Sequence, residues 1–130
     1  MNHRTILLTA GILGATGVAL GAFGAHALRD SLLERGMANA WETAVRYHLL
    51  HAIALLALGA WQKQTADGDK VLGWTARLWT IGVALFAGSL YGLALGGPRW
   101  LGPVTPLGGL AFIAGWIGVI ITAVSKRDQG

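Results

Sequence analysis

The chain has 130 residues, of which 54% are hydrophobic and 12% are charged, with a mean hydropathy of +0.55. This composition is too apolar for a water-soluble domain of that length, and it predicts a polytopic, all-α integral membrane protein with a single domain. The formal net charge of +4 does not indicate nucleic-acid binding, because the basic residues are scattered between hydrophobic segments. The sequence contains no cysteine, which excludes disulfides and thiolate chemistry.

The first hydrophobic segment predicts a transmembrane helix over residues 5–28. Its apolar run, residues 6–25, is longer than the roughly 7 to 15 residues of a signal-peptide core and is long enough to span a bilayer. His26 lies near the outer end of this helix. Glycines at helical spacing share the opposite side and predict the close approach of a neighbouring helix. These glycines are Gly14, Gly17, Gly21 and Gly24.

A polar stretch over residues 31–43 predicts a short amphipathic helix at the membrane interface. Ser31 followed by Glu34 matches the capping-box pattern, whereas Gly36 weakens the middle of the segment. We interpret the segment as a connector between two spans, with a lid over His48 and His51 of the next helix as the alternative. Its apolar face consists of Leu33, Met37, Ala40, Trp41 and Ala44.

The second span is predicted over residues 43–62 and contains two histidines. Trp41 and Trp61 bracket it as interfacial anchors. At about 1.5 Å per residue, His51 lies roughly 15 Å from Trp61, which is close to the bilayer midplane. The helical repeat places His48 on the same face as His51. That face consists of Trp41, Ala44, His48, His51, Leu55 and Gln62.

The ionisable residues of the second span have a functional and a structural interpretation. Ionisable groups at membrane depth normally face a bundle interior or a wet cavity, and they predict a functional site by default. Alternatively, a neutral histidine forms one interhelical hydrogen bond that stabilises packing. Glu42 and Arg46 lie one turn apart on another side of the helix, and we interpret them as an interfacial ion pair.

Two further spans are predicted over residues 74–96 and 106–124, after a solvated loop. Pro106 suits the first turn of the fourth span, where its missing N–H removes no hydrogen bond. In the third span, small residues at intervals of four predict a packing face within the bundle or between subunits. The glycines of this pattern are Gly88, Gly92 and Gly96. Hydroxyl groups at a depth within reach of the histidines belong to Ser89, Tyr91 and Thr105.

An even number of spans places both termini on the same side of the membrane. Basic residues that flank the spans on that side are Arg4, Lys63, Lys70, Arg77, Lys126 and Arg127. Those on the other side are Arg29, Arg35, Arg46 and Arg99. The excess predicts cytoplasmic termini by the positive-inside rule, with His26, His48, Tyr91 and Thr105 towards the outer face.

Four ordered motifs resemble one known family and cover nearly the whole chain. They are GAFGAHAL at 21–28, YHLLHAIALL at 47–56, GSLYGLALGG at 88–97 and LGPVTPLGGLAFIAGW at 101–116. These motifs are similar to those of the small bacterial inner-membrane family called domain of unknown function 423, to which the animal small transmembrane protein 256 is related. The resemblance implies four helices in the inner membrane and cytoplasmic termini, and it implies no catalytic residue.

The sequence favours a non-enzymatic function. It contains no intramembrane carboxylate pair, nucleophile elbow, zinc-protease motif or phosphate-binding loop. We expect a polar cluster that binds or conducts a small solute, ion or proton, without a cofactor. Because four closely packed helices leave little room for a pore, a pathway requires a homo-oligomer. The expected cluster consists of His26, His48, His51, Ser89, Tyr91 and Thr105.

Two alternatives remain open on the sequence. His26, His48 and His51 could bind a metal ion through three imidazoles, or haem through two of them. Against both, no carboxylate shares the histidine face to orient the rings. The other alternative is a structural or assembly partner of other membrane proteins, for which His51→Ala would weaken association or stability without abolishing flux.

Overall fold

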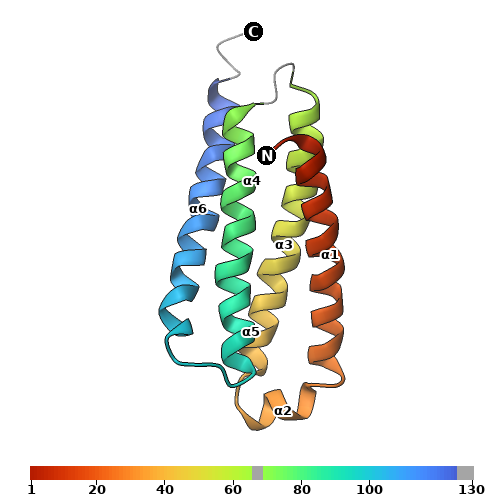
Figure 1. The fold of residues 1–130 in the computed structure, drawn as a ribbon, viewed down its shortest axis with the longest axis vertical. Helices are drawn as coiled ribbons and strands as arrows, with labels where there is room; N and C mark the ends of the chain where they lie inside the picture. Colours follow the sequence, from red (N-terminus) through yellow and green to blue (C-terminus); the bar gives the residue numbers. More distant parts are fainter. Residues whose placement is uncertain (66–68, 126–130) are drawn as a thin grey trace.

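The computed structural model describes residues 1–65 and 69–125, which form an antiparallel four-helix bundle (Figure 1). The third rod of the bundle is continuous but contains a π-helical segment, η1, between α4 and α5. In the described part of the chain, four helical rods are long and apolar enough to cross a membrane. The elements are α1 (His3–Ala25), α2 (Arg29–Glu34), α3 (Ala38–Lys63), α4 (Lys70–Gly82), η1 (Val83–Ala87), α5 (Gly88–Ala94) and α6 (Leu101–Ser125).

The predicted fold class is therefore confirmed, and the helix bounds differ from those expected at several ends. The second and fourth spans each begin five residues earlier than expected, at Ala38 and Leu101, and the fourth contains Pro106 within the helix. Pro103 falls in the first turn, where its missing N–H removes no hydrogen bond. Pro106 removes only one hydrogen bond within the helix, so the helix continues through it. Thr105 consequently lies in the second turn of α6 and not in a loop.

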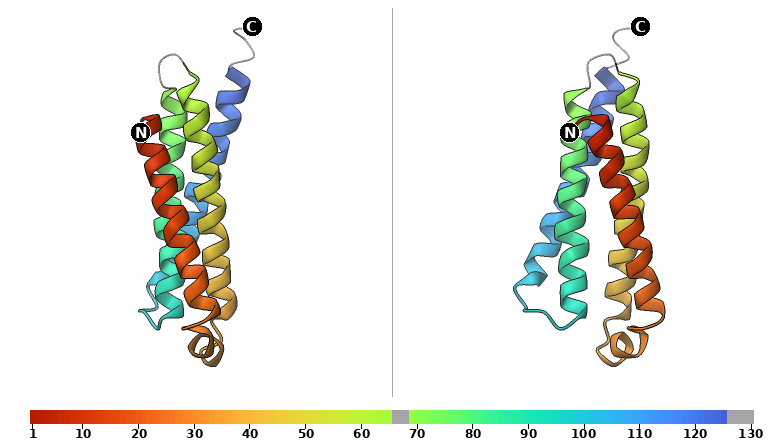
Figure 2. Two further views of the ribbon diagram at one scale, coloured as in Figure 1. Left: turned by 90° about the vertical axis from the view of Figure 1, so that its right-hand side faces the viewer. Right: turned by 45° about the vertical axis from the view of Figure 1, so that its right-hand side comes forward.

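The segment between the first two spans is not one continuous helix over residues 31–43. α2 ends where Gly36 adopts a φ of +65°, and the Met37 N–H donates to the Leu32 carbonyl across 2.9 Å to close the turn. The helix is preceded by Leu28 without a side-chain cap, so the expected capping box of Ser31 and Glu34 is not formed. α2 lies across the end of the bundle beyond α1 and α3 (Figure 2).

The bundle consists of two closely packed helix pairs, α1 with α3 and α4 with α6. In the first pair, a side chain at Gly24 would collide with the Trp41 indole, and one at Gly17 would meet Leu49. In the second pair, a side chain at Gly115 would collide with the Trp79 indole. These contacts bring the helix backbones close together, as the sequence predicts for glycines in membrane helices.

The expected glycine faces are used only in part. Gly17, Gly21 and Gly24 face α3, whereas nothing lies within 4 Å of the side-chain position of Gly14. In the third span, Gly92 packs against Leu101, while nothing lies within 4 Å of the side-chain position of Gly88. Gly96 has a φ of +88° and ends the span in a turn against Arg35. The outward direction of Gly88 leaves one of the three glycines of this stripe unused within one chain.

Candidate functional site

His48 links three helices through its two ring nitrogens. Its Nδ1 lies 3.0 Å from the Tyr91 hydroxyl on α5, and its Nε2 lies 3.3 Å from the Thr16 hydroxyl on α1. Only 4% of the His48 surface is exposed. Tyr91 in turn packs against the Trp41 ring, at a centroid distance of 4.7 Å. The first predicted histidine thus belongs to a buried polar contact that connects α1, α3 and α5.

His51 forms a separate contact with the α4–α6 pair. Its Nδ1 donates to the Tyr47 carbonyl across 2.9 Å, and its Nε2 accepts from the Trp116 indole N–H across 3.3 Å. A carbonyl only accepts and an indole N–H only donates, so the neutral Nδ1–H tautomer satisfies both partners. The ring also stacks on Phe112 at 3.7 Å between centroids. Both ring nitrogens are therefore occupied by protein groups.

The serine and threonine of the expected cluster form a third contact. The Ser89 hydroxyl donates to the Phe86 carbonyl across 3.0 Å and lies 2.6 Å from the Thr105 hydroxyl. A serine has one hydroxyl proton, so Thr105 is the donor between the two side chains. This pair joins α5 to α6 near the end of the bundle that carries α2.

The structure does not bring the six expected residues into one site. His48 contacts Tyr91, Ser89 contacts Thr105, and His51 contacts aromatic residues that were not expected to take part. His26 is exposed and follows the last residue of α1. Within residues 1–65 and 69–125, no group of three His, Cys, Asp or Glu residues is placed to hold a metal ion.

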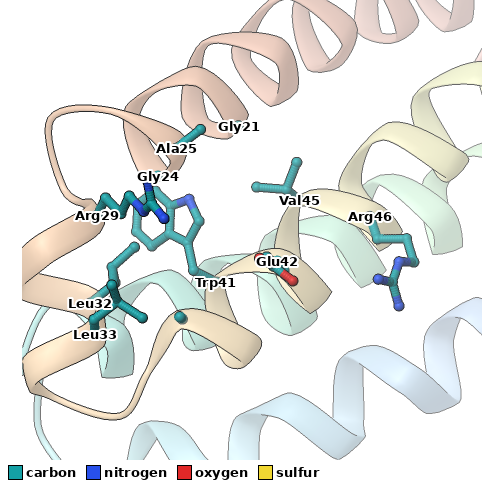
Figure 3. Close-up of a pocket in the computed structure, with 11 residues that line it drawn as sticks. Gly21, Gly24, Ala25, Arg29, Leu32, Leu33, Trp41, Glu42, Val45 and Arg46 are labelled. Carbon is teal, nitrogen blue, oxygen red and sulfur yellow. The ribbon is translucent and has the colours of Figure 1, made fainter.

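A pocket of about 670 Å³ lies at the α2 end, between α1, α2 and α3 (Figure 3). Arg29 extends beside the Trp41 ring, and the Glu42 and Arg46 side chains follow along α3 (Figure 3). Glu42 and Arg46 are both exposed, and their charged ends lie apart, so they do not form the expected ion pair. The lining consists of Gly21, Gly24, Ala25, Arg29, Leu32, Leu33, Ala38, Trp41, Glu42, Val45 and Arg46.

The sequence interpretation missed this pocket and the role of Trp41 in it. Trp41 was expected to anchor the helix at the interface, yet it is only 3% exposed and its indole N–H donates to the Leu20 carbonyl across 2.9 Å. Its place on the same helical face as the histidines was the available signal. Arg29 carried no signal beyond its charge, because its place beside Trp41 depends on how α2 lies across the ends of α1 and α3.

The model of the family described as "Protein of unknown function (DUF423)" matches residues 20–109. The chain is 37% identical to the UPF0382 inner membrane protein YgdD of Escherichia coli K12, covering 100% of this chain and 97% of that protein. It is 36% identical to the UPF0382 membrane protein YwdK of Bacillus subtilis, and the match covers 93% of this chain and 97% of that protein.

A UPF0382 membrane protein of Staphylococcus haemolyticus is 44% identical over 85% of this chain and 91% of its own length. No solved structure matches the chain. The four apolar helices agree with the names of these relatives. The chain therefore belongs to the DUF423 family, and it is a multi-pass protein of the inner membrane.

Proposed function

We propose that the protein is a non-enzymatic membrane protein that binds a small amphipathic anion in the pocket between α1, α2 and α3. The observation that carries this proposal is the pocket itself. Its volume of about 670 Å³ falls within the range of about 300 to 1,000 Å³ that is typical of small-molecule sites.

The lining favours an anion with an apolar body. Arg29 and Arg46 carry two positive charges around the pocket, against one negative charge on Glu42. Guanidinium groups bind carboxylates and phosphates through charge-assisted hydrogen bonds. Trp41 and Leu32 supply an apolar wall and are each only 3% exposed. The pocket therefore complements a ligand whose charge and apolar part lie close together.

The contacts of the histidines support a structural role for them in this proposal. His48 and His51 are each 4% exposed, and each has a protein partner at both ring nitrogens. Ligation of a metal ion or of haem requires a free ring nitrogen, so these hydrogen bonds must break before His48 or His51 can bind either of them. Conduction of an ion or proton past them likewise requires the bundle to open.

Octanoate is a suitable probe, because it combines one carboxylate with a short apolar chain. We expect it to bind the protein in nanodiscs, as measured by calorimetric titration against empty nanodiscs, while octylammonium of the same length does not bind. Arg29→Ala removes a charge-assisted contact, and we expect it to weaken binding about tenfold or more. Arg99→Ala is the matched control, because Arg99 is exposed and does not line the pocket. Equal binding of the two probes would contradict the proposal.

A homo-oligomer with cytoplasmic termini is part of the proposal. Ala84 and Gly88 are exposed on the third rod, and the space beside Gly88 is open. Small residues on an exposed membrane helix face allow a second helix to approach closely, which supports contact between subunits there. α1 begins and α6 ends at the same end of the bundle (Figure 1), and the larger number of basic residues at that end supports a cytoplasmic location.

A further inference from the structure

A second, smaller pocket lies at the opposite end of the bundle, where α3 ends and α4 begins. Its volume is about 170 Å³. It is lined by the side chain of Gln62 from α3 and by those of Lys70, Trp74 and Arg77 from α4. This pocket does not share any residue with the pocket of Figure 3, so an inference about it is independent of the proposed function.

Gln62 leaves a buried hydrogen-bond acceptor without a partner at this pocket. Its side chain is 4% exposed, and its Nε2 donates to the carbonyls of Met1 (3.1 Å) and Asp69 (3.2 Å). Because both partners only accept, the amide cannot be turned over without facing oxygen to oxygen. Its Oε1 then has no hydrogen-bond donor. A buried unpaired acceptor is costly. Because Oε1 is covered, a ligand that carries a donor reaches it only after a shift of the Gln62 side chain, and relief of this cost favours that shift.

The charges at the pocket favour an anion. Lys70 and Arg77 both line it, and the Arg77 guanidinium lies 4.8 Å from the centroid of the Trp74 ring. Among the described lining residues, the carboxylate is that of Asp69, and it already accepts from the Val71 N–H (2.8 Å) at the start of α4. The first turn of this helix adds positive potential.

An apolar groove continues from the polar pocket along α4. The groove has a volume of about 210 Å³ and shares Met1, Trp74 and Arg77 with the polar pocket. It extends to Leu78 and Ile81, and Ile81 lies about 10 Å further along the helix than Trp74. The hydroxyl of Thr80, which also lines the groove, donates to the Ala76 carbonyl within the helix. The groove therefore presents an apolar surface to the bilayer core.

We propose that the polar pocket and the groove together bind one anionic phospholipid whose headgroup carries a hydroxyl, such as phosphatidylglycerol. The phosphate lies between Lys70 and Arg77, and a shift of the Gln62 side chain lets its Oε1 accept from the headgroup hydroxyl. One acyl chain follows the groove from Trp74 to Ile81. A charged pocket at the membrane surface joined to an apolar groove is the arrangement that a phospholipid requires.

The test measures quenching of tryptophan fluorescence by lipids with brominated acyl chains. The protein is reconstituted in phosphatidylcholine vesicles that contain a small fraction of brominated phosphatidylglycerol. We expect more quenching than with the same fraction of brominated phosphatidylcholine, and we expect Trp74→Phe to remove the difference. Equal quenching by the two lipids, or an unchanged difference in Trp74→Phe, would overturn the proposal.

Two further comparisons identify the headgroup contacts. Lys70→Gln and Arg77→Gln should each weaken the apparent affinity about fivefold to tenfold, whereas Arg4→Gln, at an exposed position of the same end, should not. Phosphatidylmethanol has the same charge but no hydroxyl, and it should bind several-fold more weakly. An equal loss in Arg4→Gln would indicate only general attraction to an anionic surface and overturn the site. If inorganic phosphate displaced the lipid, the pocket would be a site for a free anion and not for a lipid. If phosphatidylmethanol bound as tightly as phosphatidylglycerol, the role of Gln62 would be overturned.

Discussion

The Trp116 indole N–H donates to Nε2 of His51 across 3.3 Å and joins α6 to the histidine near the middle of α3. Together with the hydrogen bond from Nδ1 to the Tyr47 carbonyl and the stacking on Phe112, this contact satisfies the imidazole in its neutral form. It is one of the contacts that hold the α1–α3 pair to the α4–α6 pair. An ionisable residue at membrane depth here forms part of the packing between helices.

We expect His51→Ala to destabilise the protein by about 2–4 kcal/mol, because it removes the stacked ring and two hydrogen bonds and leaves a cavity. Unfolding in a denaturing-detergent titration measures the change. Leu50→Ala is the control, because the neighbouring Leu50 is 55% exposed on the outer face of the same helix. Unchanged stability of His51→Ala together with lost octanoate binding would instead assign the histidine a direct role in function.

Two glycines of α1 should respond to alanine in opposite directions. A methyl group at Gly24 collides with the Trp41 indole, so Gly24→Ala should cost about 1–3 kcal/mol. At Gly14 the space is open, and Gly14→Ala should stabilise the helix by about 0.5–1 kcal/mol through its better helix propensity. Thermal unfolding of both variants measures the contrast. The same sign of effect for both would contradict the packing of α1 on α3.

The π-helical segment sets the register of α5 and therefore the contacts of Tyr91 and Ser89. A π-helical segment takes up one extra residue without rotating the helix that follows, so deleting Leu85 should restore a regular α-helix and leave α5 facing α3 as before. Tyr91→Phe should therefore cost about 1 kcal/mol both in the unaltered chain and in the deletion chain. A double-mutant cycle measures this, with Leu85→Ala as the control for loss of the side chain. Loss of the Tyr91→Phe cost in the deletion chain would contradict the register argument.

The orientation in the membrane can be measured directly, because the chain has no native cysteine. Asp30→Cys and Gln64→Cys place single thiols at exposed positions at opposite ends of the bundle. With cytoplasmic termini, a membrane-impermeant maleimide added outside spheroplasts should label position 30 and should label position 64 only after lysis. The reverse pattern would place the termini outside.

Subunit contact at the third rod should be visible by disulfide cross-linking. Gly88→Cys lies on the open small-residue face, and we expect a covalent dimer after copper-phenanthroline oxidation. Ile120→Cys is the control, because Ile120 is 62% exposed on α6. Cross-linking of both variants to the same extent would indicate random collision in the membrane.

The sequence determined the parts of this structure that depend on hydropathy and local periodicity. Four apolar segments of sufficient length predict four spans, and the structure contains them. The 3.6-residue repeat also identified the buried face of α3, because Trp41, His48, His51 and Gln62 are all buried there. These features follow from the properties of each helix by itself.

Only the tertiary structure decided which groups meet. Trp116 lies 65 residues after His51, and no local pattern relates the two. The positive φ of Gly36 divides the expected interfacial helix, and the extra residue of the π-helical segment directs Tyr91 towards His48. Small changes in helix rotation select different partners among similar apolar faces. Partner choice therefore depends on how all four helices pack at once, which the periodicity of one helix does not contain.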